Sequence, residues 1–564
     1  VIINKKDIYE KTILPLYKIY QQKLTDLNSC DFGDLILHTV KILEHHQDIR
    51  LIYSNNFKYI LVDEYQDTNF IQSKWLNLLS EKNRNLCCVG DDDQSIYSWR
   101  GAEIKNFLEF DQVYENTKVI RLEQNYRSSQ NILSVASNLI ANNQNRVGKN
   151  LTTTMEEGDL VKLNCFKNGK DEAIGLSDEI EKKIKKKYSY NNIAILVRAI
   201  FQTREFEERF LKVGIPYRIL GGTKFYERAE IKNALAYVRL ARFKDDDASF
   251  ERIVNTPTRG IGQRTLEELR ACARRENISL WRAAGQILMD KSLSARALGA
   301  LERFLRLIHS IGEGIQPLSL DEAVDTVIKQ SGLVEHFRKE KGEKGLARIE
   351  NMEELVTAAS EFEHNKEAHG DLEALPAFLS HAALEAGETQ ADAYSDCVHL
   401  MTLHSAKGLE FPSIYLVGME DGLFPHQRSL DDPDQLEEER RLCYVGITRA
   451  KKILTISFAQ HRRMHGSDYY PQPSRFISEI PADLINEIRL GGATISQEVF
   501  SRNTELLQEE SDFSLGQRVL HNRFGEGVVL NLEGSGSQAR VQVNFEQAGS
   551  KWLVLAYAGL QSAC

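Results

Sequence analysis

The chain has 564 residues, of which 42% are hydrophobic and 27% are charged. This length predicts about three to five domains, and the apolar content excludes disorder over most of the chain. No stretch approaches about 18 uninterrupted apolar residues, which excludes a transmembrane helix. The balance of 71 Lys and Arg against 81 Asp and Glu gives a net charge of −10 and excludes a uniformly basic coat. A basic groove for nucleic acid remains compatible with that balance, because binding depends on local charge.

Cysteine usage and the first residues indicate the compartment. The eight cysteines include no C-x-x-C pair, so neither a zinc site nor a disulfide framework is expected. Reduced thiols in a cytoplasm fit best. The N-terminal sequence VIINKKDIYEKT has no apolar core of a signal peptide. It begins with Val rather than Met, which suggests a fragment.

Short apolar runs alternate with amphipathic stretches, which predicts parallel α/β layers. Residues 228–392 read as almost wholly helical and predict an all-α insertion. Residues 486–511 are polar and predict a linker. The Gly-rich short runs of residues 512–564 predict a small β-barrel. The expected strands are Tyr59–Val62, Leu86–Val89, Val119–Leu122, Ile193–Val197, Val398–Thr402, Ile414–Val417 and Ile453–Phe458.

An acid pair follows the first expected strand, in YILVDEYQD. Ligands of open α/β sheets bind at the carboxyl ends of strands. There Asp63 suits Mg²⁺ coordination, and Glu64 suits activation of water in nucleotide hydrolysis. A plain surface acid pair is the alternative reading of these two residues alone.

Polar and aromatic residues follow the next strand, in GDDDQSIYSWRGA. Gln94 could reach a phosphate or a water molecule. Tyr97, Trp99 and Arg100 combine rings with a cation, as a stacking platform for unpaired bases does. A buried Trp with an apolar partner is the alternative.

Further candidates follow later strands. In EQNYRSS, Tyr126 could stack on a purine and Arg127 could neutralise a phosphate. In MTLHSAKGLEF, Gly408 allows close backbone approach and Glu410 could accept from ribose hydroxyls, while His404 could equally be structural. Arg449, in GITRAKK, could act as an arginine finger from a second domain.

A glycine-containing turn lies in the helical part, in NTPTRGIGQRT. Gly260 and Gly262 could expose backbone N–H groups to phosphate, with Arg259 and Arg264 beside them. A plain helix–helix turn is the alternative.

In this order the motifs DEYQDTN, GDDDQSIYSWRGA, LEQNYRS, TLHSAKGLEFP and EERRLCYVGITRAK resemble superfamily 1 DNA helicases of the UvrD/PcrA/Rep type. The resemblance implies two RecA-like domains with ATP and Mg²⁺ between them, single-stranded DNA across both, and 3′–5′ translocation. It implies the following boundaries: a helical remnant at 1–40, the first RecA-like domain at 41–122, and the second at 123–227 and 393–485. The insertion at 228–392 interrupts the second domain.

The resemblance also assigns roles to single residues. Asp63 would bind Mg²⁺, Glu64 would activate water, and Gln94 would sense the γ-phosphate. Arg127 and Arg449 would contact that phosphate, Tyr126 would stack on adenine, and Gly408 and Glu410 would lie at the nucleotide. The DNA track would involve Tyr97, Trp99, Arg100, Arg198 and His404. Arg259, Gly260 and Gly262 would touch duplex backbone.

One family element is not found, because the sequence contains no G-x-x-x-x-G-K-[ST]. In the family this phosphate loop precedes the segment seen here, so truncation is the expected reason. The predicted function is an ATP-dependent 3′–5′ DNA helicase of repair and replication. Its expected partners are single-stranded DNA, duplex junctions, RNA polymerase through the barrel, and repair proteins, with no membrane. The alternatives are a non-catalytic DNA- or polymerase-binding remnant and a RecB- or AddA-type helicase–nuclease subunit. The final domain disfavours the nuclease reading, because it has no acidic cluster.

Overall fold

The computed structural model describes residues 13–26, 29–144, 146–340, 343–365, 372–387, 395–464 and 467–489, and five strands between residues 518 and 562. The chain divides into two compact units, Val1–Ala493 and Thr494–Cys564. No described helix combines the length and the apolar character that crossing a membrane requires.

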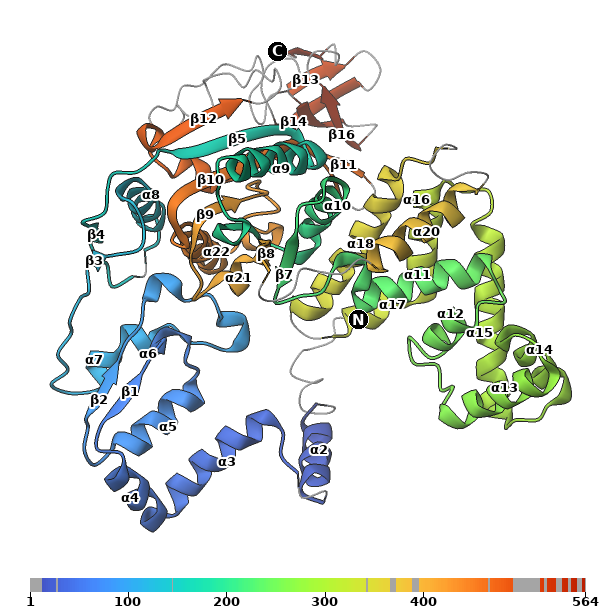
Figure 1. The fold of residues 1–564 in the computed structure, drawn as a ribbon, viewed down its shortest axis with the longest axis horizontal. Coiled ribbons are helices and arrows are strands. Elements are labelled where there is room, and N and C mark those ends of the chain that lie inside the picture. Colours follow the sequence, from blue (N-terminus) through green and yellow to red (C-terminus); the bar gives the residue numbers. More distant parts are fainter. Residues whose placement is uncertain are drawn as a thin grey trace. The chain divides into compact units, whose positions relative to one another are not determined.

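A large parallel sheet forms the centre of the first unit (Figure 1). Its strand order is β12–β5–β10–β9–β6–β8–β7, and the short β11 pairs antiparallel with β10. This finding confirms the predicted parallel α/β architecture. The strands are β5 (Val161–Asn168), β6 (Ile193–Val197), β7 (Tyr217–Leu220), β8 (Val398–Thr402), β9 (Phe411–Leu416), β10 (Ala450–Met464), β11 (Ser467–Tyr469) and β12 (Ile485–Arg489).

Helices cover this sheet because its strands are apolar on both faces. Every residue of β6, IAILV, is buried, as expected of a central parallel strand. Helices α9 (Gly169–Lys185) and α10 (Thr203–Val213) contribute Leu176 and Phe210 to an apolar core shared with the strands. Helix α22 (Pro433–Ile447) packs closely against Leu403 at Gly446, where an added Cβ would lie 2.3 Å from Leu403 Cδ2.

The N-terminal part is a smaller α/β layer around two parallel strands, β1 (Ile60–Val62) and β2 (Leu86–Cys88). Its helices are α2 (Leu14–Asp26), α3 (Phe32–His45), α4 (Gln47–Asn56), α5 (Phe70–Ser80), α6 (Lys105–Leu108) and α7 (Phe110–Val113). The strand predicted at Val119–Leu122 is wrong, because those residues are exposed and have no ladder partner among the described strands. Instead β3 (Gln124–Asn125) pairs with β4 (Thr152–Thr153), which precedes β5 and follows helix α8 (Gln130–Ile140).

The stretch predicted as an all-α insertion consists of helices around one apolar core, which includes Ile231, Phe250, Leu269, Phe304 and Leu355. These helices are α11 (Ala229–Arg242), α12 (Asp247–Ile253), α13 (Gln263–Glu276), α14 (Leu280–Asp290), α15 (Ala295–Gly314), α16 (Leu320–Ser331), α17 (Leu333–Arg338), α18 (Glu343–Glu361) and α20 (Ala374–Gly387).

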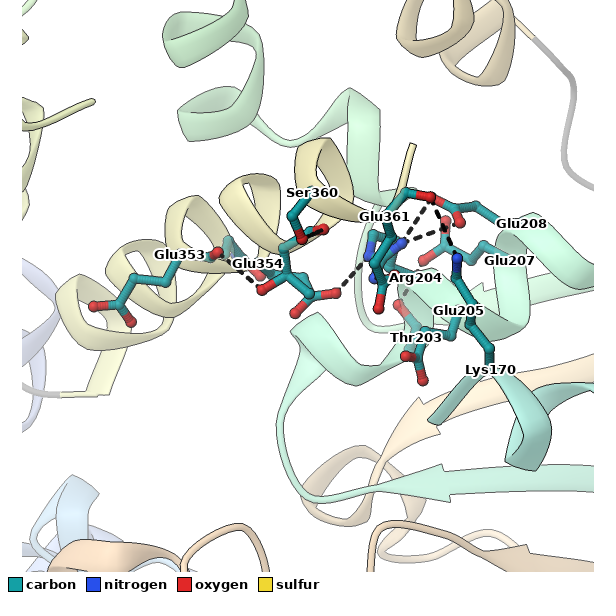
Figure 2. A network of polar contacts seen from close by, with 12 residues as sticks. Lys170, Thr203, Arg204, Glu205, Glu207, Glu208, Glu353, Glu354, Ser360 and Glu361 are labelled. Carbon is teal, nitrogen blue, oxygen red and sulfur yellow. Dashed lines mark hydrogen bonds and ion pairs between the residues drawn. The ribbon is translucent and has the colours of Figure 1, made fainter. Parts of the chain in front are cut away.

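Buried ion pairs join this helical part to the sheet (Figure 2). Arg204 of α10 contacts Glu354 and Glu361 of α18, the latter at 2.8 Å, and Glu208 at 3.1 Å. Burial raises the pKa of Glu354 to about 7, although Arg204 acts in the opposite direction. The contact is therefore polar, buried and rich in carboxylates.

The second unit contains an antiparallel sheet of order β16–β15–β14–β13–β17. Its strands are β13 (Arg518–His521), β14 (Gly525–Glu533), β15 (Arg540–Phe545), β16 (Gly549–Val554) and β17 (Leu560–Ser562). Ladder pairing between β16 and β17 is absent from the described residues, so closure into a barrel stays a prediction. The linker predicted at 486–511 begins four residues too early, because 486–489 belong to β12, which pairs with β5; residues 490–511 lie outside the described residues.

Candidate functional site

The predicted acid pair lies at the carboxyl end of β1. Asp63 Oδ1 accepts a hydrogen bond from the Glu64 amide at 2.9 Å. Glu64 has a left-handed backbone with φ 51°, which turns its side chain sharply from the strand direction. Its carboxylate accepts from Gln66 Nε2 at 2.5 Å. Both acids are exposed, so an exposed carboxylate of the kind that Mg²⁺ prefers is present at Asp63.

Lys407 joins this acidic end to the larger sheet, and sequence reasoning missed it. Its Nζ lies 2.6 Å from Asp67 Oδ2 and 3.4 Å from Glu64 Oε2, and it donates to the Gln94 carbonyl at 2.8 Å. Burial raises the pKa of Asp67, and the ammonium of Lys407 opposes that shift. The one feature of the sequence that could have indicated Lys407 is its place in SAKGLEF, directly before Gly408, whose φ is +83°.

Gln94 and Arg449 meet from opposite sides. Gln94 follows β2, whereas Arg449 follows α22, and Arg449 Nη2 lies 3.4 Å from Gln94 Oε1. The Arg449 guanidinium is buried and also donates to the Val445 carbonyl at 3.0 Å. Burial lowers the pKa of Arg449 to about 10, and the positive charge of Arg127 acts in the same direction. Among the described residues, the hydrogen-bond partners of the Arg449 guanidinium are neutral oxygens, so its charge favours the approach of an anion.

Arg127 shares its partner with a lysine. Glu410 accepts from Arg127 Nε at 2.6 Å and pairs with Lys451 Nζ at 2.6 Å. These two cations, Lys451 before Arg127, lower the pKa of Glu410 to about 2. Tyr126, beside them in sequence, is 73% exposed. An ionised carboxylate therefore contacts Arg127, and the residue before Arg127 has an accessible ring.

An aromatic cluster gathers the predicted stacking residues. The rings of Tyr97, Trp99 and His404 have centroids 6.3 Å apart in each pair. The Arg100 guanidinium lies 4.5 Å from the centroid of Trp99, which is 45% exposed. The alternative of a buried tryptophan is therefore wrong, and an exposed ring of this kind is suited to stacking on a base.

Arg198 and His404 are partly buried, whereas residues that contact DNA directly were expected to be exposed. Arg198 makes a two-pronged contact with Glu439, with Nη2 at 2.7 Å from Oε1. Burial lowers the pKa of His404 to about 4, helped by Arg198. His404 is thus neutral at pH 7, and its ring packs against the rings of Tyr97 and Trp99.

The glycine turn precedes α13. Gly260 has φ +82°, and an added Cβ at Gly260 or Gly262 would meet no atom within 4 Å. The Arg259 side chain instead turns inward and donates to the Tyr237 hydroxyl at 2.5 Å and the Ser331 carbonyl at 3.0 Å. Arg259 therefore builds the loop, whereas Arg264 is exposed.

Residues 2–115 match the UvrD/REP helicase N-terminal domain, and residues 120–461 match the UvrD-like helicase C-terminal domain. Residues 515–561 match the PcrA/UvrD tudor domain.

Similar proteins cover nearly the whole chain. DNA helicase II of Escherichia coli is 48% identical over 555 residues, which are 98% of this chain and 77% of that protein. The ATP-dependent DNA helicase PcrA of Bacillus subtilis is 39% identical over 578 residues, with the same two shares. A probable DNA helicase II homolog of Rickettsia conorii is 42% identical over 83% of this chain and 71% of that protein. The fold is that of a parallel-sheet α/β protein, and the matched family models and relatives are DNA helicases. The chain belongs to the UvrD/PcrA family.

Proposed function

We propose that this chain acts as an ATP-dependent DNA helicase that translocates 3′ to 5′ in DNA repair and replication. The observation that carries the proposal is the meeting of Gln94 and Arg449, 3.4 Å apart, from two different sheets. A nucleotide held there would link the two sheets, so its hydrolysis would change how they are joined.

The proposed division of roles follows the chemistry of each residue. Asp63 would hold Mg²⁺, which supplies charge neutralisation for the phosphates when bound. Glu64 would orient and deprotonate water, and Gln94 would contact the terminal phosphate. The cations of Arg127 and Arg449 would stabilise charge that develops in phosphoryl transfer.

Three further residues would hold the remainder of the nucleotide. Tyr126 has an exposed ring for stacking on adenine. Gly408, with φ +83°, allows close backbone approach. Glu410 is ionised, and each of its two oxygens could accept a further hydrogen bond from a ribose hydroxyl.

The DNA path is proposed to cross the aromatic cluster at Tyr97 and Trp99, with Arg100 beside them. Arg198 would act indirectly, because its guanidinium is bound by Glu439, and the His404 ring would hold the other two rings in place. Gly260 and Gly262 would contact duplex backbone. Arg259 would shape their loop from inside rather than touch DNA.

Arg449→Ala tests the proposal. The assay uses a chain extended at its N-terminus by a family phosphate-loop segment, because the 564 residues contain no G-x-x-x-x-G-K-[ST]. We expect DNA-stimulated phosphate release to fall about 10³-fold or more, as for other arginine fingers, while a fluorescent ATP analogue still binds. Arg282→Ala, at an exposed pair with Asp245, is the matched control. A loss below roughly threefold would remove Arg449 from the site.

The second unit is proposed to bind RNA polymerase, a proposal supported by its match to the PcrA/UvrD tudor domain. Deleting residues 494–564 should abolish pull-down of purified RNA polymerase and leave single-stranded DNA binding intact. Pull-down that survives the deletion would reject this partner. We also propose that this unit binds repair proteins, and pull-down of each purified repair protein with and without residues 494–564 is the test.

A further inference from the structure

Three consecutive aspartates after β2 each bind a different group of residues 146–149, which we call the strap. Arg146 makes a two-pronged contact with Asp93, at 2.9 and 2.7 Å. The Val147 amide donates to Asp92 Oδ2 at 2.8 Å. Lys149 pairs with Asp91 and lies 3.4 Å from Asp93 Oδ2. Successive acids are therefore matched by successive groups along the strap.

The strap also contacts α22, the helix that Arg449 follows. Lys149 Nζ lies 5.7 Å from the centroid of the buried Tyr444 ring in that helix. Just upstream of the strap, the Gln144 amide donates to Glu437 Oε1 at 2.8 Å, and Arg440 Nη1 donates to Asn143 Oδ1 at 2.6 Å. The strap is thus held on one side by α22 and on the other by the aspartates.

The aspartates in turn hold Gln94. Gln94 Nε2 donates to Asp91 Oδ2 at 2.8 Å, so Asp91 binds Lys149 with one oxygen and Gln94 with the other. Gln94 Oε1 faces Arg449. A closed ring of contacts therefore runs from α22 through the strap, Asp91 and Gln94 to Arg449, and back to α22.

The carboxylates of Asp91, Asp92 and Asp93 offer oxygens within 4.8 Å of one another, an arrangement that could also hold a metal ion. Here two cationic side chains and one amide already bind them. The Asp93 contact raises the pKa of Arg146. The cluster is therefore the strap's docking site, since two cations and one amide already occupy its oxygens.

We propose that the strap sets the position of Gln94 relative to Arg449, with Lys149 and Arg146 as positioning residues. The proposal rests on the proposed nucleotide site and adds two residues that have no assigned role in the nucleotide site or the DNA path. Catalytic geometry tolerates little error, because a displacement of about 1 Å can cost about a hundredfold in rate. Without Lys149, Asp91 and Asp93 would repel each other beside Gln94.

The first test needs no nucleotide and uses the 564-residue chain. Lys149→Met keeps the length of the side chain but removes its charge, and Lys149→Arg keeps the charge. Hydrogen exchange should show faster exchange of the Val147 amide in Lys149→Met by roughly tenfold, and near-normal exchange in Lys149→Arg. Lys185→Met, at an exposed position near the end of α9, is the control. Unchanged protection of the Val147 amide in Lys149→Met would overturn the proposal that Lys149 holds the strap in place.

The second test is a double-mutant cycle in the phosphate-loop-extended chain. Lys149→Met should lower kcat of DNA-stimulated hydrolysis roughly ten- to a hundredfold with KM changed less than about threefold. Lys149→Arg should recover most of kcat. Combining Lys149→Met with Gln94→Ala should cost little more than Gln94→Ala alone. Fully additive losses overturn the strap, whereas a Gln94→Ala variant of normal activity would reject the proposed nucleotide site instead.

Discussion

At the scale of single residues, Trp99 gives the sharpest prediction about DNA. Its ring is 45% exposed and has Arg100 at 4.5 Å from its centroid. Stacking contributes about 1–3 kcal/mol per base. We expect Trp99→Ala to weaken binding of single-stranded oligonucleotide about tenfold or more, as measured by fluorescence anisotropy.

The control for this prediction is Trp99→Phe, which keeps an aromatic face and should recover much of the affinity. Circular dichroism should be unchanged in both variants, because the exposed ring covers little core. Equal affinity of Trp99→Ala and the unchanged chain would remove the aromatic cluster from the DNA path.

The residues whose surroundings the sequence predicted are those set by the local chain, while their roles stay predictions. Asp63 directly follows strand β1, and Tyr97, Trp99 and Arg100 gather within four residues. Lys407 was missed because its partner Asp67 is 340 positions away, and pairing at that separation leaves no local pattern. The inward orientation of the Arg259 side chain was missed for a similar reason, since Ser331, which accepts its hydrogen bond, lies 72 positions away at the end of α16.

At the scale of elements, the turn before α13 can be tested without disturbing the fold. Gly262 has φ −88°, and an added Cβ there meets no atom within 4 Å. We therefore expect Gly262→Thr to fold normally but to lower affinity for a duplex–single-strand junction, because the side chain would separate backbone N–H groups from phosphate. Junction and single-strand titrations in parallel are the measurement. Equal losses on both substrates would contradict the assignment of this turn to duplex contact.

The polar contact between α10 and α18 should make stability depend on pH. Burial raises the pKa of Glu354 to about 7 and that of Glu205 to about 8. The folded chain thus binds more protons than the unfolded chain above the ordinary pKa of Glu, about 4.3. The stability from these groups is present at low pH and is lost as pH rises through about 7 to 8.

Glu354→Gln mimics the protonated carboxyl and should flatten that decline. Differential scanning fluorimetry between pH 5.5 and 8.5 should show a Tm that falls less steeply than in the unchanged chain. Glu302→Gln, at an exposed pair with Arg306, should keep the original slope. A constant Tm offset of Glu354→Gln at every pH would contradict a proton-linked contact.

Strands were predictable where burial on both faces makes a continuous apolar run. β6 and β8 have their predicted bounds, Ile193–Val197 and Val398–Thr402. β5 (Val161–Asn168) was missed, because its sequence VKLNCFKN mixes polar residues into a largely buried strand. Val119–Leu122 shows the converse, since an apolar β-branched run forms no strand without a neighbour to pair with.

At the scale of the whole molecule, the small β1–β2 layer exposes an apolar face. Tyr59 and Leu61 are 76% and 79% exposed, and Cys87, the register partner of Leu61, is also exposed. Unpaired strand edges and apolar faces promote association. We expect the purified 564-residue chain to self-associate in reducing buffer, as measured by size-exclusion chromatography with light scattering.

Leu61→Glu should shift that distribution toward monomer, because a charge on the exposed face opposes stacking of two copies. Leu384→Glu, at a similarly exposed position on α20, should leave the distribution of oligomers unchanged.

We also expect no DNA-stimulated ATP hydrolysis above background from the 564 residues, since no phosphate-loop motif is among them. An N-terminal phosphate-loop segment should supply both positioning and charge neutralisation, on which phosphoryl transfer depends. It should therefore restore hydrolysis, and strands added beside β1 and β2 should cover their exposed face and reduce self-association. Vigorous DNA-dependent phosphate release from the unextended chain would instead mean that another part of this sequence holds the phosphates.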